Sequence, residues 1–202
     1  MQTPKTNPHS DSSGLGNEAE VDLVRRIASQ DQYAFEVLYR IYYRRLTRFL
    51  DRITRRPHAN EEVLDDTMFA VWRKAATFNG TSQVSTWIFA IAYRMALKAL
   101  KRNRAWTQRL LLDDGEPDTA PSPEAALIEG ESRSRIKRLL ADLSPEQRAV
   151  IELTYYQGLS CAEVAQITDC PVNTVKTRMF HARRKLRLLL PQLDGSRAGS
   201  PP

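Results

Sequence analysis

The sequence is poor in the residues that build disulfide frameworks and metal sites. It includes only two cysteines and three histidines, and no apolar run approaches the roughly 18 residues that a membrane span needs. The polar N-terminus also lacks the hydrophobic stretch of a signal peptide. We therefore expect a cytoplasmic protein with no metal, no cofactor and no membrane insertion.

The two cysteines leave two interpretations open. Cys161 stands at a predicted helix start, where a thiolate is favoured, so it could sense oxidants. The spacing between Cys161 and Cys170 does not match a zinc knuckle. We favour the simpler interpretation, in which both are small packing residues.

Catalytic constellations are also missing. The carboxylates have no histidine partners, and the sequence contains neither a phosphate-binding glycine motif nor a cluster of metal ligands. We therefore expect no catalytic residues and no enzymatic activity.

What the sequence has instead is positive charge. Thirty Lys and Arg residues outnumber 24 Asp and Glu residues, which gives a net charge of +6. A basic balance favours a polyanionic partner, but it does not choose between nucleic acid and an anionic membrane. A length of 202 residues allows one medium domain or two small ones.

Composition and periodicity divide the chain into five parts. Two basic stretches with helical apolar spacing are separated by an acidic, proline-containing stretch, and polar tails flank them. We predict an all-α fold of two small helical domains joined by a flexible acidic linker. The predicted parts are a disordered tail (1–19), a first domain (20–104), the linker (105–131), a second domain (132–190) and a frayed tail (191–202).

The second domain carries the pattern of a helix-turn-helix. Ser160 and Glu163 have the spacing of a capping box, the chain then breaks between Thr168 and Pro171, and a second helix can begin at about Pro171. Another cap, Ser144 with Gln147, opens an earlier helix. The apolar faces expected for the two helices are Ala162, Ala165 and Ile167, and then Val172, Val175, Met179, Ala182 and Leu186.

The other side of the second helix mixes small polar residues with cations. Polar side chains near the N-terminus of a helix can reach base edges in the DNA major groove, and cations further along can hold phosphates. A solvated amphipathic helix is the simpler alternative, but the spacing of cap, break and cap favours a DNA-reading helix.

In the first domain, acidic and basic residues are segregated. A helix predicted to start near Asn60 carries Glu61, Glu62, Asp65 and Asp66, whereas the next helix, from about Val84, is basic. The dipole of a helix N-terminus explains Glu61 and Glu62. A contact with a basic partner is an equally good explanation for the two aspartates, which lie a turn further on.

These motifs resemble the extracytoplasmic-function (group 4) sigma factors of bacterial RNA polymerase. DCPVNTVKTRMFHARRKL resembles region 4.2, LSPEQRAVIELTYYQGLSCAEVA resembles region 4.1, and EEVLDDTMFAVWRKA with FNGTSQVSTWIFAIAYRMALKALKR resembles regions 2.2 to 2.4. The resemblance implies a subunit that binds core RNA polymerase, recognises two promoter elements and helps initiate transcription as an alternative sigma factor. It also implies a partner anti-sigma factor.

The resemblance assigns roles to three sets of residues. The clamp helices of the polymerase beta-prime subunit would dock on Asp65, Asp66, Phe69 and Trp72. The minus-ten element would meet Phe78, Asn79, Thr81, Ser82, Ser85, Arg94, Lys98, Lys101 and Arg102. The minus-thirty-five element would meet Asn173, Thr174, Lys176, Thr177, Arg178, Phe180, His181, Arg183 and Arg184.

Two of the aromatic residues keep a second interpretation. Trp87 could support the minus-ten loop, but its place in the apolar series of its helix favours a core position. Phe180 could meet a thymine methyl group or could simply support its helix.

A free-standing helix-turn-helix regulator is the alternative function. It would not explain why an acidic and aromatic helix precedes a polar loop and a basic helix.

Overall fold

The computed structural model describes residues 16–55, 57–112 and 142–194. Within these ranges the chain is helical, as the all-α prediction requires. The elements are α1 (Asn17–Ala28), α2 (Gln32–Thr54), α3 (Pro57–Lys74), the short 3-10 helix η1 (Ala75–Thr77), α4 (Val84–Leu112), α6 (Pro145–Tyr155), α7 (Cys161–Thr168) and α8 (Val172–Asp194). Residues 1–15 of the predicted tail (1–19), residues 113–131 of the predicted linker (105–131) and residues 132–141 of the predicted second domain lie outside the described residues. The predicted tail extends too far, because α1 already begins at Asn17.

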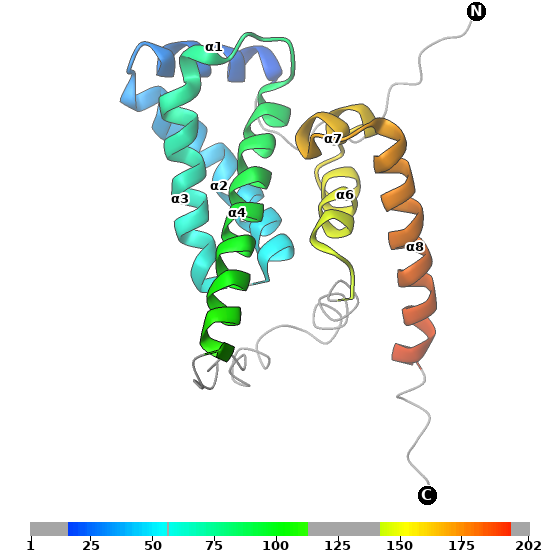
Figure 1. The fold of residues 1–202 in the computed structure, drawn as a ribbon. Helices are drawn as coiled ribbons and strands as arrows, with labels where there is room; N and C mark the ends of the chain where they lie inside the picture. The colour runs from blue at the N-terminus through cyan, green and yellow to red at the C-terminus, as the bar shows by residue number, and fades with distance from the viewer. Residues whose placement is uncertain (1–15, 56, 113–141, 195–202) are drawn as a thin grey trace, which may run out of the picture.

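The first domain is a bundle of α2, α3 and α4, with α1 lying across one end of it (Figure 1). Its centre is aromatic, because Phe89 packs edge-on against both Phe49 and Tyr42, with ring centroids 5.2 and 6.4 Å apart. All three side chains are fully buried, and burying each contributes about 1.5–3 kcal/mol. Asp31 caps α2, since its side chain accepts a hydrogen bond of 3.0 Å from the backbone N–H of Ala34.

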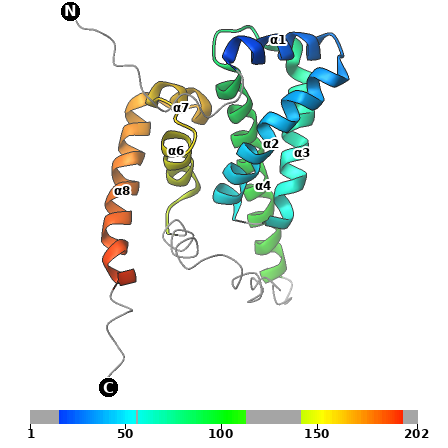
Figure 2. The ribbon, with the colours of Figure 1, turned by 180° about the vertical axis from the view of Figure 1, so that it is seen from behind.

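The second domain consists of α6, α7 and α8, and α8 lies on the side away from the first domain in both ribbon views (Figures 1 and 2). Its small core includes Val150, Leu153, Ile167, Val175 and Ala182. The two domains are not separate in space. Helix α6 packs against α2, and α7 packs against α4.

Two helices are longer than the sequence predicted. Helix α4 continues to Leu112, past the predicted end of the first domain at 104, and α8 continues to Asp194, past the predicted end of the second at 190. The segment AWTQRLLL after residue 104 contains no glycine or proline, so nothing in it stops a helix. The strong change in composition begins only at Asp113.

Candidate nucleic-acid interfaces and partner face

The helix-turn-helix predicted at Ser160 is present. The hydroxyl of Ser160 accepts from the backbone N–H of Glu163, and the carboxylate of Glu163 accepts from the backbone N–H of Ser160 at 2.8 Å, which completes the capping box. Helix α7 ends at Thr168, and Asp169 adopts the left-handed conformation (φ 50°) that turns the chain into α8. Ser144 and Gln147 form a second capping box, at the start of α6.

Two details of the predicted apolar faces are wrong. Ala162 is exposed, and Val164 takes its place in the core because α7 is rotated about its axis relative to the expected face. Val172 is 38% exposed, since it lies in the first turn of α8, before the helix reaches its neighbours. Val175, Met179 and Ala182 are buried as predicted.

The side of α8 opposite this stripe presents most of the predicted DNA-contacting residues to solvent. Asn173, Lys176, Thr177, His181 and Arg184 are exposed. Two others on this helix, Thr174 and Arg178, are half-buried. The helix therefore has a polar N-terminal part and a cationic middle on one side, which matches what a major-groove reader requires.

Three residues of the predicted minus-thirty-five set contact neighbouring side chains, and these contacts bear on their predicted roles. Phe180 is 63% exposed and stacks edge-on against His181, so it does not support the core. The guanidinium of Arg183 lies over the ring of Tyr155, 5.5 Å from its centroid. Arg178 Nη1 lies 3.5 Å from Cys170 Sγ, which draws this cation toward the turn.

The predicted minus-ten loop lies between η1 and α4. Asn79 Oδ1 accepts hydrogen bonds from the backbone N–H and the hydroxyl of Thr81, at 3.1 and 2.7 Å, which shapes the loop around Gly80. Gly80 has φ 72°, a conformation that side chains rarely adopt. Asn79 and Thr81 are exposed and Ser82 is half-buried.

One residue of the predicted minus-ten set does not lie on this surface. Ser85 is 8% exposed, because it falls in the first turn of α4 where the helix enters the bundle. Trp87 is half-buried and packs against Phe78 with ring centroids 5.2 Å apart, so it supports the loop and the core at once.

Helix α4 carries its predicted cations on the surface. Arg94, Lys98, Lys101 and Arg102 are exposed. Arg102 Nη2 lies 3.0 Å from Glu62 Oε1, in an ion pair that joins α4 to the acidic helix α3. Both side chains are more than half exposed, so this pair contributes at most about 1 kcal/mol.

The acidic and aromatic face of α3 is exposed as predicted. Asp65, Asp66 and Phe69 point to solvent, and Phe69 is 60% exposed. Trp72 is half-buried against Phe35, with ring centroids 5.2 Å apart. A large exposed phenylalanine flanked by carboxylates is typical of a contact with another protein.

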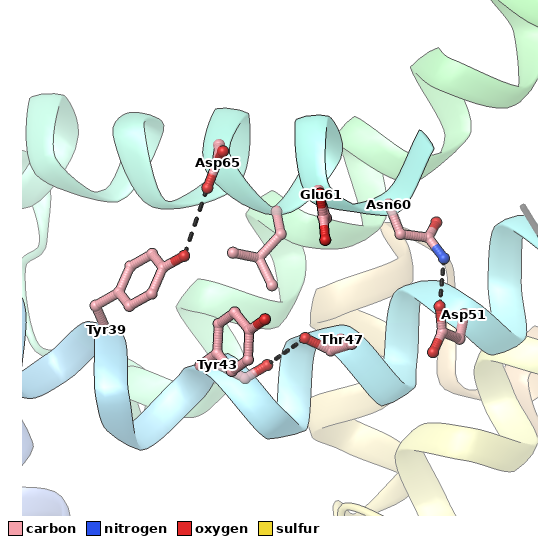
Figure 3. Close-up of a pocket in the computed structure, with 8 residues that line it drawn as sticks. Tyr39, Tyr43, Thr47, Asp51, Asn60, Glu61 and Asp65 are labelled. Atoms are coloured by element: carbon pink, nitrogen blue, oxygen red, sulfur yellow. Dashed lines mark hydrogen bonds between the residues drawn. The ribbon is translucent and has the colours of Figure 1, made fainter. Parts of the chain in front are cut away.

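Beside this face lies a pocket of about 340 Å³ between α2 and α3, which sequence reasoning missed (Figure 3). Tyr39, Tyr43, Glu61 and Asp65 are among its lining residues, and the hydroxyl of Tyr39 reaches Asp65 Oδ1 at 3.5 Å. Burial and then the charge of Asp65 raise the pKa of the Tyr39 hydroxyl. The spacing of Tyr39 and Tyr43 was the available signal, but in sequence Tyr39 was indistinguishable from a core residue.

Neither a metal site nor a membrane helix occurs in the parts of the chain that the structure describes. No group of three or more potential metal ligands lies together among residues 16–55, 57–112 and 142–194. In the same ranges, no helix combines the length and the apolar character that crossing a membrane would require.

Comparison with known proteins explains why these surfaces occur in one chain. The family model for Sigma-70 region 2 matches residues 38–106, and the one for Sigma-70, region 4 matches residues 133–186. The ECF RNA polymerase sigma factor SigK of Mycobacterium tuberculosis is 33% identical over 168 residues, which cover 82% of this chain and 90% of SigK. This chain belongs to the ECF sigma factor family. A SigK from Mycolicibacterium vanbaalenii is 31% identical and covers 85% of this chain and 90% of its own length.

Two solved structures share this fold. The sigma factor RpoE, in its complex with the anti-sigma factor NepR from Bartonella quintana, has a TM-score of 0.66 at 25% identity, over 78% of this chain and 96% of RpoE. CnrH, in complex with the cytosolic domain of CnrY, has a TM-score of 0.64 at 24% identity, over 86% of this chain and 98% of its own.

The matched regions coincide with the two helical domains. Region 2 covers most of α2, all of α3 and much of α4, whereas region 4 covers α6, α7 and most of α8. ECF sigma factors are a family of transcription factors that are not enzymes. The exposed face of α3 and the exposed side of α8 therefore lie in different sigma regions of one chain.

Proposed function

We propose that this ECF sigma factor binds core RNA polymerase through α3, reads the minus-ten element with the loop before α4, and reads the minus-thirty-five element with α8. One observation carries the proposal. A single chain exposes an acidic and aromatic face in its region 2 and a polar and cationic helix face in its region 4. A free-standing regulator would have no use for the first of these surfaces.

The polymerase contact would be made by Asp65, Asp66, Phe69 and Trp72. A basic helix of the partner, which the family resemblance identifies with the clamp helices of the beta-prime subunit, complements the carboxylates, and Phe69 supplies an apolar anchor. The pocket between α2 and α3 extends this surface. Its tyrosine rings and carboxylates suit the side chain of an arginine or a lysine.

DNA recognition would be divided between the two domains. Asn79, Thr81 and Ser82 offer hydrogen bonds to an unstacked base, and the cations along α4 follow the backbone. On α8, Asn173, Lys176 and Thr177 face the bases of the upstream duplex. Because each surface is small, specificity depends on both being engaged at once.

An anti-sigma factor completes the proposal. RpoE has been solved in complex with an anti-sigma factor, and its fold is shared by this chain. The exposed Phe69 and Phe180 lie on the two proposed working surfaces. A protein that covered either ring would block polymerase or promoter binding, which is how we expect the activity to be restrained.

The direct test is a pull-down of core RNA polymerase with the full chain. The double charge reversal Asp65→Lys, Asp66→Lys should abolish retention of the polymerase, because it places two cations opposite a basic partner. Asp22→Lys, an exposed aspartate on α1, is the matched control and should retain it. Failure of the unaltered chain to retain polymerase, with duplex DNA still bound, would favour the free-standing regulator instead.

A further inference from the structure

A chain of hydrogen bonds crosses the turn of the helix-turn-helix. The hydroxyl of Thr168, the last residue of α7, donates a hydrogen bond of 2.7 Å to the backbone carbonyl oxygen of Val164. Thr168 Oγ1 also lies 3.2 Å from Cys170 Sγ, in the turn itself. Cys170 Sγ lies 3.5 Å from Arg178 Nη1, in the second turn of α8, which is within hydrogen-bond range because sulfur is larger than oxygen. Three side chains therefore connect the end of α7 to α8.

The number of available protons fixes the direction of this chain. A hydroxyl has a single proton, and Thr168 gives it to Val164, so Thr168 Oγ1 can only accept from Cys170. A guanidinium has donors and no acceptor, so Arg178 donates to the sulfur. Cys170 thus donates with its S–H group and accepts with its sulfur at the same time. It has to be a thiol to do both, because a thiolate has no proton to give.

This thiol orients the guanidinium of Arg178. No carboxylate forms an ion pair with Arg178 in the part of the chain that the structure describes. Thr168 is 7% exposed, whereas Cys170 and Arg178 are half-buried. The chain therefore begins at a side chain that is fixed in the core, and its next two bonds carry this order outward to the guanidinium. The other N–H groups of Arg178 stay available for a second partner.

Another cation of the predicted minus-thirty-five set shows what this contact adds. Arg184 is exposed, and it forms no side-chain hydrogen bond or ion pair with any residue in the described ranges. An exposed arginine loses rotamer freedom when it binds a phosphate, and that loss weakens binding. Arg178 has given up part of this freedom in the free protein already. Its contact with a phosphate would therefore be made at a lower entropic cost.

We propose that Cys170 is a positioning residue for the minus-thirty-five element, whose thiol holds Arg178 in the orientation that contacts a DNA phosphate. The inference rests on the proposed function, since it takes α8 as the helix that binds this element. Cys170 itself does not touch the DNA and acts through Arg178. The turn of the helix-turn-helix and its reading helix are thus joined by a side chain that serine can imitate and alanine cannot.

A double-mutant cycle on the holoenzyme tests this role. The full chain is assembled with core polymerase, and its dissociation constant for a promoter fragment, selected by transcription in vitro from a genomic pool, is measured at several salt concentrations. Cys170→Ala should weaken binding about threefold to tenfold. It should also make the plot of log K against log salt shallower by about 0.9, which is the signature of one lost phosphate contact. Cys170→Ser keeps a donor and an acceptor and should retain most of the affinity.

The cycle separates positioning from damage to the fold. In an Arg178→Ala background, Cys170→Ala should have no further effect, whereas in an Arg184→Ala background its full effect should remain. Cys161→Ala, at the other half-buried cysteine, should bind as the wild type does. An equal loss from Cys170→Ala with and without Arg178, or no loss at all, would overturn the positioning role. Promoter binding that neither Arg178→Ala nor Lys176→Ala changed would instead overturn the proposed function, because α8 would then not bind the element.

Discussion

The hydroxyl of Tyr42 donates a hydrogen bond of 2.6 Å to Glu20 Oε2, in the interior of the first domain. Glu20 is 3% exposed, and its second oxygen has no hydrogen-bond partner within the described part of the chain. Burial raises the pKa of this carboxyl, against the smaller opposing effects of the Tyr42 hydrogen bond and the charge of Arg45. The contact ties α1 to α2 and carries an electrostatic cost when Glu20 is ionised.

The first prediction follows from the sign of that shift. A carboxyl whose pKa is raised in the folded state stabilises the fold in acid, and this contribution is lost as the pH rises through the folded pKa. Glu20→Gln keeps an acceptor for Tyr42 but cannot ionise, so it should unfold at a higher temperature than the wild type at about pH 8. The advantage should shrink toward about pH 4.5. Thermal unfolding of both proteins, followed by circular dichroism between about pH 4.5 and pH 8, provides the measurement. An increase in unfolding temperature that did not vary with pH would contradict the prediction.

The second prediction concerns a cap supplied from another helix. Asn17 Oδ1, at the start of α1, accepts a hydrogen bond of 3.1 Å from the backbone N–H of Val84, the first residue of α4. Asn17→Ala should lower the free energy of unfolding by about 1 kcal/mol, as loss of an N-terminal cap does. Asn17→Asp keeps the acceptor and should retain most of the stability. Denaturant unfolding of both variants provides the measurement.

The third prediction concerns the helix-turn-helix. Ser160→Ala removes half of the capping box of α7 and should also cost about 1 kcal/mol, or roughly 2–4 °C in melting temperature. Ser160→Thr preserves the hydroxyl and is the control. If Ser160→Ala had the same melting temperature as the wild type, the cap would contribute nothing to the stability of this domain.

The fourth prediction separates DNA reading from polymerase binding. Lys176→Ala should weaken binding of the holoenzyme to promoters about tenfold to a hundredfold, because a good base contact is worth about 1–3 kcal/mol. Arg187→Ala, an exposed cation further along α8, should have a smaller effect. Affinity for core polymerase should be unchanged in both, and its loss in Lys176→Ala would show that α8 has a different partner.

Local signals in the sequence predicted the helices well. The caps predicted at Ser144 and Ser160 are both formed, because the two residues of a capping box are only three positions apart and one short pattern encodes them. Helix ends were less predictable where no glycine or proline marks them. Ser85 illustrates the limit for site residues, since its burial depends on how α4 enters the bundle and not on its neighbours in sequence.

The contact between the domains could not be predicted. Arg52 belongs to a run of cations on α2, a pattern that is typical of a solvent-exposed helix face. Glu152 has the spacing of an ordinary polar residue on a helix surface. Nothing local indicates that these two side chains meet across 100 residues of sequence. The pocket beside Asp65 was missed for the same reason, because it is formed by two helices whose relative placement only the fold determines.

Transcription in vitro tests the central claim most directly. Core RNA polymerase, with and without this chain, is given a pool of genomic promoter fragments, and the RNA start sites are mapped. The account predicts a discrete set of start sites that appear only with the chain, share two upstream sequence elements at a constant spacing, and disappear with Asp65→Lys, Asp66→Lys. Start sites identical to those of core polymerase alone would contradict it.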